Sequence, residues 1–204
     1  MKEEKEKQND EDLRAVKQCL EGDIEAFESI VSRYQKPMLN VAFRMLDSYD
    51  DACDVLQEAF IAAYKGLRKY RSEARFSTWL HAIVMNRARN RLKQKGSRGG
   101  RELRIDAPIT KEDGSIYIDV ASKDRSALEI LESDDIRERV HKCIAGLEED
   151  FRAVIILRDL QGLSYDEIAE TLGIPSGTVR SRLFRAREGV KDCLVKLMGD
   201  HGEL

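Results

Sequence analysis

The hydrophobic positions of this chain follow helical spacing through most of its length. Apolar residues recur every three or four positions over 13–20 and 24–45, where Pro37 is expected to kink or interrupt the second helix. The same spacing returns over 55–67, 78–95, 136–147 and 151–160, and Ser48, Ser77 and Ser133 are placed to cap three of these helices. Strand-like alternation occurs over 116–120, but one isolated strand is not stable alone. The pattern therefore predicts an all-α fold.

The last helical stretch has the pattern of a helix-turn-helix. Ser164 and Glu167 form a capping box that starts a short helix, and Gly173 stands where that helix must end in a left-handed conformation. Ser176 is placed to cap a second helix. The apolar stripe of this helix consists of Val179, Leu183, Ala186 and Val190. Because arginines occupy the rest of its surface, the pattern predicts a recognition helix that enters the DNA major groove.

Changes in composition divide the chain into four parts. Residues 1–10 are highly charged and are expected to be disordered, and residues 11–95 should form a first helical domain. Residues 96–129 contain glycine, Pro108 and scattered acids without helical spacing, which predicts a flexible interdomain linker. Residues 130–204 should form a second helical domain that contains the helix-turn-helix. The predicted fold is thus two small helical domains joined by a flexible linker, which leaves their relative placement open.

Charge is unevenly distributed over the 204 residues, although the net charge is only −3. One basic patch runs from Arg87 to Arg104 and a second follows Thr178, whereas acids gather near the N-terminus, over 47–58 and over 106–149. Two basic patches in an acidic chain indicate two nucleic-acid contacts and a further surface that meets another partner.

The cysteines and the N-terminus indicate the setting of the protein. Cys19, Cys53, Cys143 and Cys193 are far apart, so buried free thiols in a reducing compartment are expected, and zinc binding by His141 and Cys143 is disfavoured. No metal or cofactor is predicted. The N-terminus has no apolar signal core, and no apolar run approaches the ~18 residues of a membrane span. These features predict a cytoplasmic protein without membrane insertion.

One face of the helix after Ser48 is acidic. Asp54 and Glu58 are like charges four positions apart, which slightly destabilise an isolated helix, and Ile61 continues the same face. Gln57 lies beside them. Two interpretations stay open, a solvated acidic face and a surface that docks on a basic partner helix.

The helix over 78–95 has a polar strip in its second half. The strip consists of Asn86, Arg87, Asn90 and Arg91. Asparagine can form hydrogen bonds with base edges, and arginine can neutralise phosphates. Just before this helix, Phe76 and Trp79 flank a polar turn, and their rings fit either a pocket for an unstacked base or an ordinary core.

Four motifs in order resemble bacterial RNA polymerase sigma factors. They are DVLQEAF at 54–60, FSTWL at 76–80, NRARNRL at 86–92 and SYDEIAETLGIPSGTVRSRLFRARE at 164–188. More narrowly, the chain resembles the small extracytoplasmic-function (ECF) group of the sigma-70 family. The resemblance covers about residues 11–95 and 130–195. It implies that 11–95 is the region 2 domain, which binds polymerase and the −10 element, and that 130–204 is the region 4 domain, which binds the −35 element.

The resemblance also implies roles for individual residues. Polymerase binding, to the coiled coil of the β′ subunit, would fall to Asp54, Gln57, Glu58 and Ile61. Binding of the −10 element would fall to Phe76, Asn86, Arg87, Asn90 and Arg91, with the turn before Phe76 holding a flipped base. Binding of the −35 element would fall to Thr178, Arg180, Ser181, Arg182, Phe184, Arg185 and Arg187.

The partners implied by the family are core RNA polymerase (its β′ coiled coil and its β subunit), promoter DNA in duplex and single-stranded form, and an anti-sigma factor. The function implied is that of an alternative sigma factor for a stress or envelope-response regulon. A dimeric helix-turn-helix regulator that binds an operator by itself is the alternative, although it leaves the acidic face and the asparagine strip without a role. A nucleic-acid enzyme lacks a catalytic constellation in this sequence. The regulon, the inducing signal and any redox role of the cysteines are not indicated.

Overall fold

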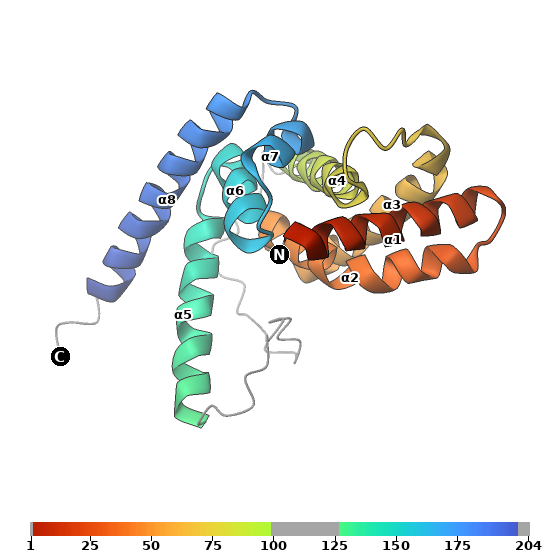
Figure 1. Ribbon diagram of the computed structural model, residues 1–204. Coiled ribbons are helices and arrows are strands. Elements are labelled where there is room, and N and C mark those ends of the chain that lie inside the picture. Colours follow the sequence, from red (N-terminus) through yellow and green to blue (C-terminus); the bar gives the residue numbers. More distant parts are fainter. Residues whose placement is uncertain (1, 99–126, 200–204) are drawn as a thin grey trace.

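The computed structural model describes residues 2–98 and 127–199, and every regular element within these ranges is helical. The N-terminal unit consists of α1 (Lys2–Leu20), α2 (Glu25–Leu46), α3 (Tyr49–Gly66), the short 3₁₀ turn η1 (Leu67–Lys69) and α4 (Phe76–Arg98). The C-terminal unit consists of α5 (Ala127–Ala145), α6 (Glu149–Ile155), one turn of π-helix, η2 (Ile156–Leu160), α7 (Tyr165–Leu172) and α8 (Ser176–Gly199) (Figure 1). The fold class is the one predicted, an all-α chain with two helical groups.

The predicted helix-turn-helix is confirmed in its local detail. The Ser164 hydroxyl accepts a hydrogen bond from the Glu167 amide at 3.2 Å, and the Glu167 carboxylate accepts one from the Ser164 amide at 2.7 Å. Gly173 ends α7 with φ +64°, a conformation that costs glycine least because it has no Cβ. Ser176 does not cap α8 but lies in its first turn, where its hydroxyl donates to Asp166 at 3.0 Å.

Several helix boundaries differ from the predicted ones. The structure places residues 2–10 in α1 rather than in a disordered segment, and α1 is tied to the rest of the unit because the Asn9 side chain accepts from the Phe76 amide at 3.2 Å. α2 passes through Pro37 without interruption. Likewise α4 continues through Gly96 to Arg98, and α5 passes through Ser133, which therefore does not cap it. In contrast, Ser48 caps α3 as predicted, accepting from the Asp51 amide at 3.4 Å.

Buried polar groups hold α1 against α2. Asp12 is 1% exposed, and it accepts hydrogen bonds from Tyr34 and Arg33, both at 2.5 Å. Burial raises the pKa of Asp12, although the bonds from Tyr34 and Arg33 oppose this effect. The ordered N-terminal helix thus depends on a buried carboxylate whose partners lie more than twenty positions along the chain, which no local pattern could indicate.

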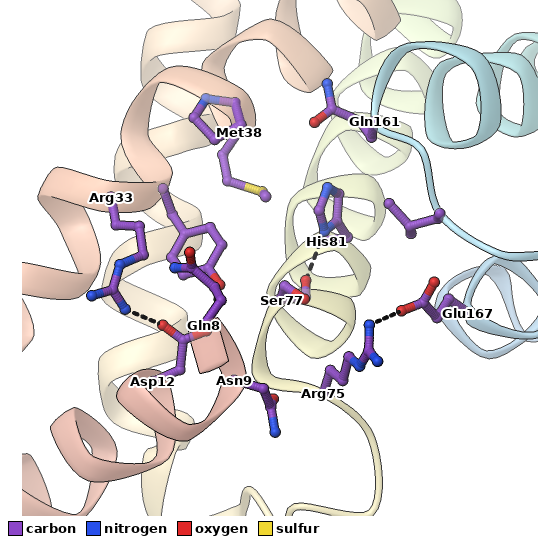
Figure 2. Close-up of a pocket in the computed structure, with 13 residues that line it drawn as sticks. Gln8, Asn9, Asp12, Arg33, Met38, Arg75, Ser77, His81, Gln161 and Glu167 are labelled. Atoms are coloured by element: carbon purple, nitrogen blue, oxygen red, sulfur yellow. Dashed lines mark hydrogen bonds and ion pairs between the residues drawn. The ribbon is translucent and has the colours of Figure 1, made fainter. Parts of the chain in front are cut away.

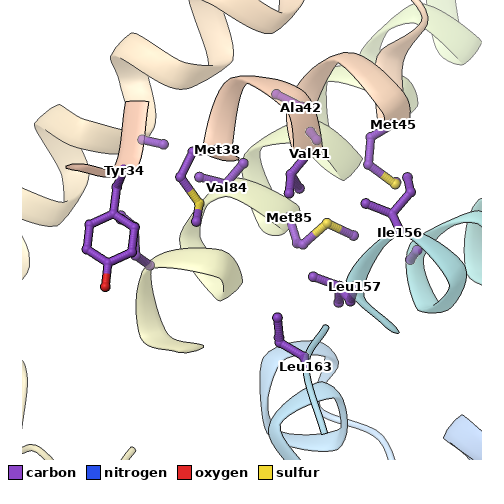
Figure 3. Close-up of a cluster of buried hydrophobic side chains, with 14 of the residues drawn as sticks. Tyr34, Met38, Val41, Ala42, Met45, Val84, Met85, Ile156, Leu157 and Leu163 are labelled. Carbon is purple, nitrogen blue, oxygen red and sulfur yellow. The ribbon is translucent and has the colours of Figure 1, made fainter. Parts of the chain in front are cut away.

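The two units share one apolar seam. Met45 of α2 and Met85 of α4 are fully buried, and they face Ile156 and Leu157 of η2, which are also fully buried (Figure 3). Leu163, just before α7, is 6% exposed beside them. The sequence left the placement of the two domains open. In the structure they pack together because the apolar sides of α2 and α4 meet that of η2.

Polar contacts surround this seam. The Arg152 guanidinium donates to the Met45 carbonyl at 2.7 Å, and the His141 ring lies 2.8 Å from the Asp47 carboxylate. On another side, a cavity of about 290 Å³ lies between the units, lined by side chains from α1, α2, α4 and the segment before α7 (Figure 2). Arg75 of the N-terminal unit and Glu167 of α7 form an ion pair of 3.4 Å at this cavity.

The cysteine prediction is wrong for one pair. Cys143 of α5 and Cys193 of α8 form a disulfide across fifty positions, because the two helices bring their Cα atoms to 5.7 Å. Cys19 and Cys53 are free, as expected, but they are half-buried rather than buried. The predicted linker lies mainly outside the described residues, as does the strand-like stretch 116–120, and the rest of 96–129 belongs to α4 and α5. Within the described ranges, no helix combines the length and the apolar character needed to cross a membrane.

Candidate nucleic-acid interface and acidic docking face

The second helix of the helix-turn-helix presents a cationic face. Val179, Leu183 and Ala186 are at most 1% exposed and fix α8 against the rest of the C-terminal unit. The opposite side exposes most of the residues predicted to bind the −35 element, namely Arg180, Ser181, Phe184, Arg185 and Arg187, whereas Thr178 and Arg182 are half-buried. All seven lie within three turns of one helix, so the structure brings them together as an elongated surface.

The arginines of this surface differ in their partners. Arg182 pairs with Asp150 of α6 at 2.5 Å, and Arg187 forms a two-pronged pair with Asp159 at 2.6 and 3.0 Å. The Arg180 guanidinium lies 5.9 Å from the centre of the Tyr165 ring. Arg185 is exposed and has no ion pair among the residues that the structure describes. Two exposed guanidinium groups, Arg180 and Arg185, are thus without a carboxylate partner in this part of the chain.

Phe184 adds an apolar group to the same surface. Its side chain is 69% exposed between two arginines of α8. An exposed phenylalanine beside exposed guanidinium groups fits contact with a nucleic-acid base or a thymine methyl group better than a purely electrostatic contact with phosphates.

The strip on α4 is only partly exposed. Asn86, Arg87 and Asn90 are exposed, whereas Arg91 is half-buried. Phe76 is fully buried, and its ring packs against the rings of Tyr34, Tyr70 and Trp79 at centroid distances of 5.5–5.9 Å. The prediction that Phe76 contacts DNA is therefore not compatible with this arrangement.

The core interpretation fits Trp79 as well. Its ring packs against Tyr70 and Phe76, with centroids 5.1 and 5.5 Å away. It also lies close to Gly66, where a Cβ would approach the ring to 3.3 Å, a tight contact that the glycine avoids. The polar turn over 71–73 is exposed, so a base contact by that turn itself is still a prediction.

The acidic face of α3 is exposed and is flanked by cations. Asp54, Gln57, Glu58 and Ile61 all lie on it, and the side chain of Ile61 is 48% exposed. Arg91 of α4 lies 3.4 Å from Asp54 and 3.3 Å from Glu58, and Arg87 lies 3.4 Å from Glu58. The surfaces predicted to bind polymerase and the −10 element therefore adjoin, and their charges partly neutralise each other.

Asp51 anchors this charge network at the start of α3. Its carboxylate pairs with Arg91 at 3.1 Å and with Lys95. Burial alone would raise the pKa of Asp51, but hydrogen bonds from Lys95, Ser48 and Arg91 outweigh it and lower the pKa. Asp51 is thus an internal counter-ion for α4 and is not part of the exposed docking face.

Sequence reasoning missed the internal partners of the arginines. Asp150 accepts from Arg89 of α4 at 2.9 Å and also pairs with Arg182 of α8, so one carboxylate joins helices of both units. Glu149 pairs with Arg89 at 3.0 Å. The only signal in the sequence was a cluster of acids at the start of α6, and such a cluster is typical of any helix N-terminus.

A group of three or more potential metal ligands does not occur among the described residues. The two residues considered for zinc have other partners, since Cys143 is in the disulfide and His141 contacts Asp47.

Comparisons with known proteins identify the family. The Sigma-70 region 2 family matches residues 30–98, and the Sigma-70 region 4 family matches residues 137–188. The chain is 37% identical to the RNA polymerase sigma-H factor of Pseudomonas aeruginosa over 195 residues, which covers 93% of this chain and 96% of the relative. It is 40% identical to the ECF RNA polymerase sigma-E factor of Haemophilus influenzae over 191 residues, covering 92% and 97%.

A solved structure has the same fold. The sigma factor RpoE of Bartonella quintana, crystallised in complex with the anti-sigma factor NepR, superposes with a TM-score of 0.63 at 21% identity, covering 84% of this chain and 98% of that one. The chain belongs to the ECF group of the sigma-70 family. It is an alternative sigma factor, a transcription initiation factor that recognises promoters.

Proposed function

We propose that this sigma factor divides its contacts between the two units. The N-terminal unit binds core RNA polymerase and the −10 element, and the C-terminal unit binds the −35 element. The observation that carries the proposal is the presence of two exposed surfaces of opposite charge, the acidic face of α3 and the arginine face of α8, on the parts of the chain that match regions 2 and 4.

Polymerase binding is assigned to Asp54, Gln57, Glu58 and Ile61. An exposed isoleucine next to acids suits a partner helix that is both basic and amphipathic, such as a coiled coil of the β′ subunit. The C-terminal unit supplies the contact with the β subunit. Because polymerase is the partner, the protein acts in the cytoplasm.

Contact with the −10 element is assigned to α4 and the turn before it. The exposed amides of Asn86 and Asn90 lie one helical turn apart and can form hydrogen bonds with base edges. Arg87 and Arg91 neutralise phosphates, and the exposed turn over 71–73 holds an unstacked base of the melted strand.

Contact with the −35 element is assigned to the exposed side of α8. Arg180, Ser181, Phe184 and Arg185 meet base edges in the major groove, with Thr178 at the start of the helix. Arg182 and Arg187 bind phosphates once they exchange their carboxylate partners for DNA.

An anti-sigma factor is the proposed regulator, and the regulon is one of stress or envelope response. The structural relative crystallised with an anti-sigma factor supports this assignment, because both chains share one fold. A partner that covers the acidic face would prevent polymerase binding directly.

The test is run-off transcription with purified core polymerase on a library of randomised promoters, read by sequencing. We expect the chain to select templates with two conserved elements at a fixed spacing. Core polymerase that stays as unselective with the chain as without it would contradict the proposal. In a control without polymerase, tight and selective binding to a palindromic duplex would instead favour a dimeric helix-turn-helix regulator.

A further inference from the structure

A disulfide joins the recognition helix to another helix of the same unit. Cys193 lies on α8, beyond the exposed arginine face, and its sulfur is bonded to Cys143 near the end of α5. The structure assigns to this pair a reversible redox site, which a hydroperoxide oxidises and a dithiol reduces. This inference does not depend on which DNA or polymerase contacts the chain makes.

The two sulfurs differ in access to solvent. Cys143 is 2% exposed and belongs to the core side of α5, whereas Cys193 is only half-buried. A small oxidant in solution therefore reaches Cys193 first, and Cys143 is placed to resolve the oxidised form from inside the unit.

Charged residues of both signs neighbour Cys193 along α8, where Asp192 directly precedes it. Lys196 follows Cys193 by three positions on α8, which is less than one helical turn. Arg139 of α5 donates to the Leu197 carbonyl at 3.3 Å, one turn beyond Cys193, although it also pairs with Asp135 at 2.8 Å. The thiolate of Cys193 is the form that attacks peroxides.

The chemistry balances as a two-electron oxidation. The Cys193 thiolate attacks one oxygen of the hydroperoxide, the O–O bond breaks, and the products are Cys193 sulfenic acid and the corresponding hydroxide or alkoxide, which takes up a proton. The Cys143 thiol then attacks the Cys193 sulfur. An S–S bond forms, and the sulfenic oxygen leaves as water with the proton of Cys143. A dithiol returns two electrons and two protons by exchange.

The C-terminal unit has a core that does not need the bond. Ile144, Val154 and Leu183 are at most 3% exposed. Leu147 packs so tightly against Gly189 of α8 that a Cβ there would lie 2.9 Å from the leucine methyl group. Because these contacts hold the first half of α8 in place, the disulfide can open and close in a folded unit.

The end of α8 depends more on the bond. Beyond Cys193 most side chains are exposed, including Val195 at 62% and Met198 at 68%. A hydrogen bond from Arg139 to the Leu197 carbonyl also joins this region to α5. Reduction is therefore expected to loosen the last turns of α8 and to leave the arginine face unchanged.

The first experiment uses the full chain reduced with dithiothreitol, freed of reductant and exposed to hydrogen peroxide. Remaining thiols are alkylated and the peptides are identified by mass spectrometry. We expect a Cys143–Cys193 cross-link that native-state dithiothreitol removes, while Cys19 and Cys53 remain alkylatable. The variants Cys19→Ser and Cys53→Ser should cross-link like the wild type. In Cys143→Ser, Cys193 should accumulate as a sulfenic acid that dimedone traps.

The second experiment compares hydrogen–deuterium exchange of the oxidised and reduced full chain, with Cys193→Ser as a permanently reduced variant. Loss of protection should be confined to the end of α8 and the facing part of α5. Four results would overturn the inference: no cross-link, a cross-link through Cys19 or Cys53, a cross-link that opens only after denaturation, or exchange that is either unchanged or increased throughout the unit.

Discussion

The Arg91 guanidinium of α4 lies 3.4 Å from the Asp54 carboxylate of α3. The first residue is proposed to bind promoter DNA and the second to bind polymerase, yet in the free chain each is the counter-ion of the other. Glu58 lies 3.3 Å from the same guanidinium. When polymerase covers Asp54 and Glu58, Arg91 keeps only Asp51 of its three carboxylate partners, which favours its contact with phosphates. The geometry thus couples the two contacts through a shared charge.

Asp54→Arg should weaken binding to core polymerase before it affects any other property. The change replaces an exposed acid of the docking face with a cation, which repels a basic partner helix and adds to the charge of Arg91. We expect a loss of about tenfold or more, or ~1.4 kcal/mol, in affinity measured by fluorescence anisotropy with core enzyme. Asp50→Arg, on the same helix but without a pair to α4, is the matched control. Unchanged affinity of the Asp54 variant would contradict the assignment of the acidic face.

Arg91→Ala should weaken binding to −10 DNA without weakening binding to core polymerase. Without the guanidinium, Asp54 and Glu58 are less neutralised, so the affinity for core polymerase should stay the same or increase slightly. Binding of the holoenzyme to single-stranded −10 DNA should decrease, and its salt dependence should become less steep by about one phosphate contact. Both are measured by titration at several salt concentrations. A parallel loss of both affinities would indicate a structural role for Arg91, through its pair with Asp51, and would contradict the coupling.

Arg180→Ala and Arg185→Ala should weaken recognition of the −35 element. Both guanidinium groups are exposed and lack a carboxylate partner in the described part of the chain, so they are available to DNA without the loss of an ion pair. We expect each substitution to cost ~1–3 kcal/mol in holoenzyme binding to a promoter duplex. Arg187→Ala is the control, and it should cost less because Arg187 must first leave Asp159. Equal losses of core-polymerase binding would refute the separation of roles.

The sequence predicted features that depend on neighbouring residues. The capping box of Ser164 and Glu167 and the left-handed Gly173 were predictable because each depends on backbone groups within a few positions. The burial of Phe76 was not predictable, since an aromatic residue at a helix start fits both a base pocket and a core. Its burial is decided by Tyr34 and Tyr70, which approach it only in the folded unit.

Contacts between residues far apart in the sequence could not be predicted from the hydrophobic pattern. Asp150 joins Arg89 to Arg182, and Cys143 meets Cys193, across separations for which helical spacing carries no information. The helical structure of residues 2–10 also depends on a distant residue, because the Asn9 side chain accepts a hydrogen bond from the Phe76 amide. Local charge alone predicted disorder there, and a tertiary contact determined the outcome.

Asp150→Ala should shift the free chain toward a more open arrangement of its two units. Asp150 pairs with Arg89 at 2.9 Å and with Arg182 at 2.5 Å, and both pairs are lost together. Because Asp150 is about half exposed, each pair is worth only ~0.2–1 kcal/mol, and since only the Arg89 pair joins the two units, the open fraction should increase by up to about fivefold. Small-angle X-ray scattering measures this as a larger radius of gyration. Asp159→Ala, which breaks a pair within the C-terminal unit, should leave the radius unchanged, and equal expansion in both variants would contradict the role of Asp150.

Acid should weaken the contact between α2 and α5 through Asp47. A hydrogen bond with His141 is the main cause that lowers the pKa of Asp47 in the folded chain. A carboxyl group with a lowered pKa stabilises the folded state at pH values above the ordinary carboxyl pKa of ~3.9. This contribution is lost as the pH falls through the lowered pKa. Since the Asp47 side chain is 58% exposed, the effect should not exceed ~1 kcal/mol.

Asp47→Asn is the variant that tests this contact. Asparagine tolerates the left-handed backbone that Asp47 adopts at the end of α2, with φ +52°, so the change removes the charge without adding strain. Urea denaturation of the full chain at a series of pH values should show a smaller decrease in unfolding free energy below pH ~4 for the variant than for the wild type. His141→Ala should also make the acid-induced decrease in unfolding free energy smaller. In the double variant, this decrease should be no smaller than in either single variant. An unchanged pH dependence in both single variants would show that Asp47 and His141 do not form this pair in solution.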